Sequence, residues 1–240
     1  MAIALNGAAI SASAGSGSLN MPEWTPAAND LCIFMAGWRD ATPVSSSVSG
    51  NGLTWVRSLS VMNTQGQNGF QVWYATGLAP TTGCINYDIT GNALPVVCIA
   101  QRFSGVNVGA ASAGIERTAS SIGPAVDNND MLENITTITD SAWAVAGGTH
   151  RSRNFTAPSG ETGILVNAVG GTGGNQTKVS MWYQNPGAIS PPATCQLGGL
   201  ADLSGSDDWC MAILDLMPTA SLLVARVPHK RILDFPHYRM

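Results

Sequence analysis

A single histidine in the body of this 240-residue chain limits the acid–base chemistry that the chain could perform. His150 ends an apolar run, whereas His229 and His237 lie close to the C-terminus. A Ser-His-Asp arrangement would have to use His150 as its base. The sequence has no GxSxG turn for a nucleophilic serine, and "SGSDD" at 204–208 is predicted to be a turn with two solvated aspartates. Nucleophilic catalysis is therefore not the expected function.

Paired carboxylates would be a second route to catalysis, as in glycoside hydrolases. That chemistry needs two acids about 5–10 Å apart in a cleft. Glu116, Glu133 and Glu161 are candidates, but each lies in loop-like sequence and no spacing pairs them. A glycan hydrolase with such a cleft is kept as the enzymatic alternative, and no catalytic residue is predicted.

Metal and cofactor sites have few candidate residues. Asp127 and Asp130 in "DNND" could hold Ca²⁺ through their oxygens, but the segment lacks the spacing of an EF-hand and is predicted to be a surface turn. "GGTGGNQ" at 170–176 lacks the lysine and the following helix of a phosphate loop, so we expect a hairpin loop there. The chain has no CxxC and no Cys/His pair at metal spacing. We therefore expect no metal and no cofactor.

Three of the five cysteines lie inside apolar runs. Cys32, Cys98 and Cys210 are expected to be buried thiols that act as small hydrophobes. Cys84 and Cys195 each begin a short strand-like run. Nothing in the spacing indicates a disulfide, and the redox state of the last two is left open.

Charge is scarce and unevenly spread. Only 11% of the residues are charged, the net charge is −4, and glycine (27) and proline (13) are abundant. The last fifteen residues carry Arg226, Lys230, Arg231 and Arg239 against Asp234, which gives them about +3 and leaves about −7 for the rest. Because phosphate binding needs clustered cations, we do not expect the body to bind nucleic acid.

No membrane segment is expected. The longest apolar runs fall well short of the roughly 20 residues that span a bilayer. The N-terminus, "MAIALNGAAISASAGSG", lacks the cationic region of a signal peptide. These features predict a soluble protein made in the cytoplasm, without a membrane partner.

The elements that must position any site are short strands. Period-2 runs and short apolar runs dominate, and turn clusters such as "SGNG" and "PSGETG" separate them. Such regular spacing is typical of a β-sandwich. The predicted fold is therefore all-β, an antiparallel, jelly-roll-like sandwich. The expected strands cover residues 3–5, 8–13, 31–38, 53–61, 69–75, 84–89, 96–103, 142–150, 163–168, 178–184, 194–197 and 209–216.

A Trp-Tyr pair occurs twice, in "VWYATG" at 72–77 and in "MWYQNPG" at 181–187. A shift of about 110 residues also aligns "DLCIFMAGWRD" at 30–40 with "DSAWAVAGGTH" at 140–150, and brings "VVCIAQRF" onto "WCMAILDL". With "SGNG" on "PSGETG" and "CINYDITG" on "CQLGG", five such features agree in order. We therefore predict two pseudo-repeated halves, with chance similarity between β-hairpins as the alternative.

The repeated pair has a direct structural interpretation. Neighbouring side chains in a strand point to opposite faces. Trp73 and Trp182 are predicted to be buried in the core, and Tyr74 and Tyr183 to lie on the outer face or at an edge. A sugar-stacking role for the tyrosines is the alternative to a purely structural one.

Two other tryptophans are the better candidates for exposure. Trp24 lies in a Pro-flanked loop and Trp38 ends a strand. An exposed tryptophan could stack on a sugar ring or anchor a protein interface. Together with Tyr74 and Tyr183, they are the aromatic side chains that we expect to be able to contact a partner.

The order of these motifs resembles a family of jelly-roll-like β-sandwich domains found in virion structural proteins of tailed bacteriophages and in secreted bacterial adhesive proteins. The resemblance covers about residues 1–217 and rests on "NDLCIFMAGWRD", "GNGLTWV", "QVWYATG", "INYDITG", "IAQRFSGVN" and "SGSDDWCMAILDLMP". It implies a place among tail appendages, capsid decorations or adhesive proteins. It implies no catalytic motif, and fold alone does not fix function.

The last residues, 218–240, depart from that pattern. "SLLVARV" is strand-like, and Pro228 and Pro236 then break any regular element. A solvated tail would not need so many apolar side chains, so we predict an arm that docks on a neighbouring subunit, partly by strand addition. Fold-back onto its own domain is the alternative, and nucleic-acid binding is a third reading. The predicted contact residues are Leu222, Leu223, Val224, Arg226, Lys230, Arg231, Ile232, Phe235 and Tyr238.

These features together predict a non-enzymatic structural protein of a tailed-phage virion, with a β-sandwich domain (1–217) and a C-terminal arm (218–240). The expected place is the outside of the head, as a capsid decoration, cement or head-fibre component that is docked on other virion subunits and forms a homo-oligomer. The alternatives are a tail appendage and a carbohydrate-binding adhesin module for a host-surface glycan. The expected localisation is the virion, after synthesis in the host cytoplasm.

Overall fold

The computed structural model describes residues 2–15, 17–39, 45–63, 68–91, 95–109, 111–123, 129–137, 142–172, 176–184, 193–199, 203–204 and 207–219. These residues form antiparallel β-structure and one short 3-10 helix, η1 (Ala111–Gly114). The first half contains β1 (Ala4–Leu5), β2 (Ile10–Ala14), β3 (Leu19–Asn20), β4 (Leu31–Arg39), β5 (Ser45–Gly50), β6 (Val56–Asn63), β7 (Asn68–Ala75), β8 (Ile85–Thr90) and β9 (Val96–Ser104). The second half contains β10 (Ile115–Ile122), β11 (Met131–Thr137), β12 (Trp143–His150), β13 (Glu161–Gly170), β14 (Thr177–Gln184), β15 (Ala193–Gly199) and β16 (Trp209–Leu216).

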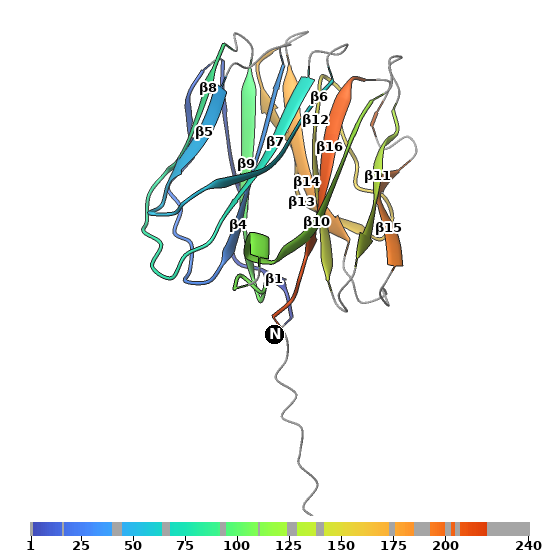
Figure 1. Ribbon diagram of the computed structural model, residues 1–240. Coiled ribbons are helices and arrows are strands. Elements are labelled where there is room, and N and C mark those ends of the chain that lie inside the picture. The colour runs from blue at the N-terminus through green and yellow to red at the C-terminus, as the bar shows by residue number, and fades with distance from the viewer. Residues whose placement is uncertain are drawn as a thin grey trace, which may run out of the picture.

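The sheets of the described residues are stacked in four layers (Figure 1). An outer sheet, β3-β8-β5, covers a large sheet of order β1-β9-β4-β7-β6, in which β2 also pairs with β9. The second large sheet, β10-β16-β12-β14-β13, lies against the first, and β11-β15 covers its far side. The prediction of an all-β antiparallel sandwich is confirmed. That the sandwich has four layers was not predicted from the sequence.

Three apolar cores hold these layers together. The central core lies between the two large sheets and includes Ile33, Phe70 and Met181. The first outer core, with Phe34 and Trp73, lies under β3-β8-β5, and the second, with Trp182, lies under β11-β15. The inner strands are therefore buried on both faces, which explains why β4 reads as a nearly unbroken apolar run. By contrast, β8 has one wet face and alternates strictly between buried and exposed positions.

Consecutive strands enter the layers in a similar order in the two halves, except that β5 has no counterpart among the described strands between β12 and β13. In the first half β2, β4, the β6–β7 hairpin and β9 enter the large sheet, whereas β3, β5 and β8 enter the outer one. In the second half β10, β12, the β13–β14 hairpin and β16 enter the large sheet, whereas β11 and β15 enter the outer one. The large sheets thus share one strand order, β9-β4-β7-β6 and β16-β12-β14-β13. The jelly roll and the pseudo-repeat of sequence stay predictions.

The Trp-Tyr pairs are placed as expected in one respect and not in another. Trp73 and Trp182 are buried, with 8% and 0% of their surface exposed, as predicted. Tyr74 and Tyr183 do point to the opposite face, but that face is covered by the other large sheet, so both rings pack half-buried against the central core. The expected outer face is thus the interface of the two large sheets, and the alternative of an edge position holds for Tyr74, which lines a pocket where the edge strands of these sheets meet.

Trp24 and Trp38 are also buried, which corrects the prediction that they are exposed. Trp24 pairs with Gly83 through its backbone, and its ring lies under the Arg102 guanidinium, 5.4 Å from the ring centroid. Trp38 occupies the space left by the missing side chain of Gly69, where an added Cβ would lie 2.2 Å from the indole. Neither ring is available as an aromatic platform.

The two large sheets touch at a pair of glycines. A Cβ on Gly37 of β4 would lie 2.5 Å from Val179 Cγ2 in the opposite sheet. A Cβ on Gly147 of β12 would lie 2.1 Å from Met35 Sδ, again across the interface. Glycine in a strand often marks such a close approach. The distance between the sheets therefore depends on both positions having no side chain.

We expect Gly37→Ala to lower the free energy of unfolding by about 1–3 kcal/mol, since the added methyl meets the stiff β-branched side chains of Val179 and Thr149. Gly147→Ala should cost less, because the flexible Met35 thioether can move. Urea denaturation measures both. Gly83→Ala is the control, because nothing lies within 4 Å of its added Cβ. Equal stability of all three variants would contradict this account.

Candidate functional site

The two ends of the body differ in what they present. We call "base" the end that holds β1, η1 and residues 216–219, and "rim" the opposite end, where β4 ends and β7 and β16 begin. Figure 1 shows the N-terminus at the base. The register of β12 and β16 shows which residues lie at each end: Trp143 pairs with Leu216 near the base, and His150 pairs with Trp209 at the rim.

The chain leaves the described body at the base through a set of backbone hydrogen bonds. The amide of Met217 donates to the Gly114 carbonyl (2.8 Å), and the Asn107 amide donates to the Met217 carbonyl (2.9 Å). The Thr219 amide then donates to the Gly105 carbonyl (2.7 Å). The point where the chain leaves the described body is thus fixed beside the end of β9, close to β1 at the start of the chain. The nine predicted contact residues of the arm lie outside the described residues.

An open pocket of about 260 Å³, which we call the base pocket, lies beside this exit. Leu78 and Val108 are its two large apolar side chains, and 81% of the Leu78 surface is exposed. Its position beside the exit follows from Val108, whose amide donates to the Val106 carbonyl (2.9 Å), the same oxygen that accepts from the Thr219 hydroxyl (3.2 Å). The full lining is Asn29, Thr76, Gly77, Leu78, Val108 and Gly109.

A second pocket of similar volume, the seam pocket, lies where the edge strand β6 of one large sheet meets the edge strand β10 of the other. It contains Tyr74, one of the predicted contact residues, in a half-buried position. The other aromatic pair member, Tyr183, is stacked on Trp143 with ring centroids 4.5 Å apart. The lining of the seam pocket is Arg57, Ser58, Tyr74, Ile115, Glu116, Arg117 and Thr118, a mainly polar set.

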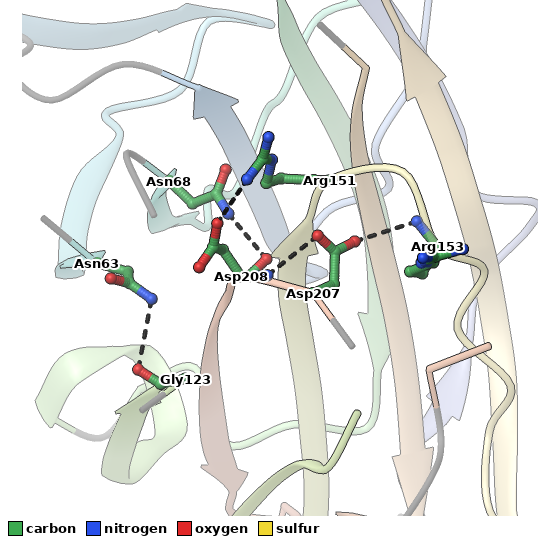
Figure 2. Close-up of polar contacts among 7 residues, drawn as sticks. All are labelled: Asn63, Asn68, Gly123, Arg151, Arg153, Asp207 and Asp208. Atoms are coloured by element: carbon green, nitrogen blue, oxygen red, sulfur yellow. Dashed lines mark hydrogen bonds and ion pairs between the residues drawn. The ribbon is translucent and has the colours of Figure 1, made fainter. Parts of the chain in front are cut away.

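A buried polar network joins the two halves at the rim (Figure 2). The Asn68 side-chain amide donates to the Asp208 carbonyl (2.8 Å), and Arg151 forms an ion pair with the Asp208 carboxylate (2.8 Å). The Asp207 carboxylate accepts from the amides of Arg153 (3.1 Å) and Asp208 (3.0 Å). Asn63 adds a longer bond to the Gly123 carbonyl (3.4 Å). Since Asn63 and Asn68 belong to the first half, the network ties the halves together.

This network corrects the prediction of two solvated aspartates. Asp207 and Asp208 have only 4% and 8% of their surface exposed. Burial raises the pKa of Asp207, and the two backbone amides that it accepts from act in the opposite direction. This cluster was not predicted from the sequence because the contacts that join it to other segments span 54 to 140 residues along the chain, from Arg153–Asp207 to Asn68–Asp208.

His150, the one body histidine, is enclosed at the same end. Its surface is fully buried, and its Nε2 lies 3.3 Å from the Ser180 hydroxyl. That hydroxyl oxygen also accepts from the Asn167 amide (2.9 Å). Burial lowers the pKa of His150 to about 3, and the nearby Lys178 charge acts in the same direction. A neutral imidazole held inside the sheet is a packing and hydrogen-bonding element.

The three candidate acids lie in strands, not in loops as expected. Glu116 is in β10 beside the seam pocket, and Glu133 is in β11, where it accepts from the Asn134 amide (2.7 Å). Glu161 begins β13 and accepts from the Gly198 amide (3.0 Å). They occupy three different strands, and the Gly198 amide that Glu161 accepts from is next to Leu197, the residue that pairs with Glu133. The "DNND" segment lies partly outside the described residues.

The cysteines are free thiols, and the described residues hold no group of three or more His, Cys, Asp or Glu side chains that could bind a metal. Cys32, Cys98 and Cys210 are buried, as predicted. Cys195 is buried as well, and Cys84 is exposed. Over the part of the chain that is described, no helix is long and apolar enough to cross a membrane.

Comparison of the chain with models of protein families, with curated proteins and with solved structures finds no match. The resemblance to phage virion sandwich domains therefore stays a prediction. The features that can indicate a function are the base with its pocket and chain exit, and the seam pocket with Tyr74.

We expect the stability of the protein to fall as the pH drops below 6.5. The unfolded imidazole of His150 binds a proton near pH 6.5, whereas the folded one stays neutral down to about pH 3. Stability is thus lost across that window, by up to about 1.4 kcal/mol per pH unit. Urea unfolding between about pH 6.5 and pH 5, where few carboxylates titrate, measures it. His150→Gln should flatten the profile, and an unchanged slope in that variant would disprove the assignment.

Proposed function

We propose that this protein is a non-enzymatic structural subunit of a tailed-bacteriophage virion, placed on the outside of the capsid as a decoration, cement or head-fibre component. One observation carries the proposal: both ends of the described chain meet at the base, and the apolar, basic arm begins there, at Thr219. An arm that starts at one end of the body can engage a neighbour while the opposite end of the body faces away from the shell. A tail appendage held in the same way is the near alternative.

Charge supports docking on a neighbour. The arm carries about +3 and the rest of the chain about −7. Opposite charges steer association and set register more than they add affinity. The same balance allows the arm of one copy to bind the body of another, so a homo-oligomer on the shell is part of the proposal. Neither nucleic acid nor membrane is a proposed partner.

The register around β9 argues against one form of the fold-back alternative. A chain that continued from Thr219 along β9 would have to pair with Phe103. Phe103 is already paired with Leu5 of β1 on one side and with Leu31 of β4 on the other. The arm therefore cannot extend as an extra strand on β9, and strand addition must use a free edge such as β6 or β10, on the same copy or on a neighbour.

Carbohydrate binding is the second candidate function, and the seam pocket is the observation that favours it. Tyr74 offers a half-buried ring, and hydroxyl, carboxyl and guanidinium groups belong to the residues around it. Sugar sites commonly combine an aromatic face with such polar groups. The localisation in either case is the virion, with a host-surface glycan as the partner of the pocket.

We expect a chain that ends at Thr219 to fold as the full protein does but to lose its assembly. The bonds of residues 217–219 to the base are kept, so the shortened chain should still unfold in one cooperative transition. Light scattering and pull-down on phage particles should show the full chain oligomeric or bound and the shortened chain monomeric and free. If shortening leaves oligomeric state and particle binding unchanged, the arm does not attach the protein.

For the glycan alternative, we expect Tyr74→Ala to weaken binding of any glycan retained on an array by about tenfold, since the ring face is lost. Arg117→Ala, at an exposed position of the same pocket, should weaken it without disturbing the core. Arg153→Ala, exposed at the rim and outside the pocket, is the matched control. Binding that survives both pocket variants would place the glycan site elsewhere.

A further inference from the structure

The base pocket presents apolar surface where little else on the body does. Leu78 is the most exposed large apolar side chain of the described residues, and the next, Ile122, has 47% of its surface exposed against 81%. Val108, its neighbour in the pocket, packs on the central core, so the pocket floor is rigid. An exposed leucine in an open pocket offers apolar surface on which a further apolar side chain can pack.

The chain exit lies within reach of this pocket. The Thr219 hydroxyl donates to the Val106 carbonyl (3.2 Å), and the same carbonyl accepts from the Val108 amide (2.9 Å), so Thr219 and the pocket wall share one acceptor. The first apolar pair after the exit is Leu222 and Leu223. An extended chain covers about 3.3–3.6 Å per residue, so three residues span roughly 10 Å.

We propose that the base pocket is the seat of the first apolar residues of the arm, Leu222 and Leu223 of the same chain. The volume of about 260 Å³ suits one or two leucine side chains. A segment tethered only three residues away has a high effective concentration at the pocket, which a separate molecule would have to overcome. Seating these leucines covers Leu78 and removes apolar surface from water.

The consequence is a fixed direction for the rest of the arm. Arg226, Lys230 and Arg231 follow the leucine pair and would project from the base at a set position. This proposal does not depend on the virion function. If both hold, Leu222 and Leu223 pack on the body, and the basic residues that follow them are the part of the arm that contacts a partner.

Hydrogen exchange of the full-length protein tests the seat. In the wild type, peptides covering 76–78 and 106–109 should be protected; in Leu222→Asp with Leu223→Asp they should exchange at least about fivefold faster. The matched control changes a later apolar pair, Ile232→Asp with Leu233→Asp, and should leave exchange at the base unchanged. If the proximal pair leaves exchange at the base unchanged, or the distal pair speeds it equally, the proposal is overturned.

A reciprocal variant acts from the pocket side. Leu78→Asp changes an exposed side chain and should leave the fold intact. It should speed limited cleavage by trypsin after Arg226 at least about fivefold, because the proximal arm is released. Unchanged cleavage would overturn the seat.

Dilution of the protein tests whether the leucines in the base pocket come from the same chain or from a neighbouring copy. Protection at 76–78 that persists at concentrations where light scattering shows monomer supports seating within one chain. Protection lost on dilution assigns the pocket to a neighbouring arm and overturns the proposal as stated. Binding to phage particles is measured separately, with the full chain and the chain that ends at Thr219. If the leucines do not occupy the base pocket but the full chain still binds particles, the virion proposal stands.

Discussion

The structure depends on the direct contact of the two large sheets. Gly37 and Gly147 lie on the facing sides of the two sheets, where an added Cβ on Gly37 would meet Val179 and one on Gly147 would meet Met35 and Phe70. Each sheet thus contributes a position without a side chain to the contact. The central core fills the space between the facing sides of the two large sheets, and the outer sheets cover the remaining apolar faces.

That arrangement explains which parts of the fold the sequence could predict. Strands with strong apolar or alternating patterns, such as β4, β7 and β16, are found where expected. The strands that were missed are short or polar: β3, β5, β10 and β11. β5 reads SSSVSG and is a strand only because β8 pairs with it and Val48 fills the outer core. Pairing across the sheet, not local pattern, decides such elements.

The candidate site was less predictable, for a related reason. Aromatic side chains at strand ends or in Pro-flanked loops, Trp38 and Trp24, were expected to be exposed, but partners remote in sequence, Gly69 and Arg102, enclose them. The aspartates at 207–208 resemble a polar turn until the amides of a distant loop meet them. The base pocket has no local signal at all, because residues from three separate segments form it. The sequence shows that residues 218–240 are rich in apolar and basic side chains, and the structure shows that residues 217–219 are held at the base.

The path of β16 has a mechanical consequence. This strand runs from the rim to the base in the interior of its sheet, hydrogen-bonded to β12 along its whole length and to β10 along nearly all of it, and it leads directly to the exit at Thr219. A pull on the C-terminus away from the base acts along the strand axis, perpendicular to the ladder hydrogen bonds, so those bonds are loaded together in shear and not broken one after another. A body tethered by its C-terminal end would thus be held by a strand that is hydrogen-bonded on both sides, and the load would be shared by the two neighbouring strands β10 and β12.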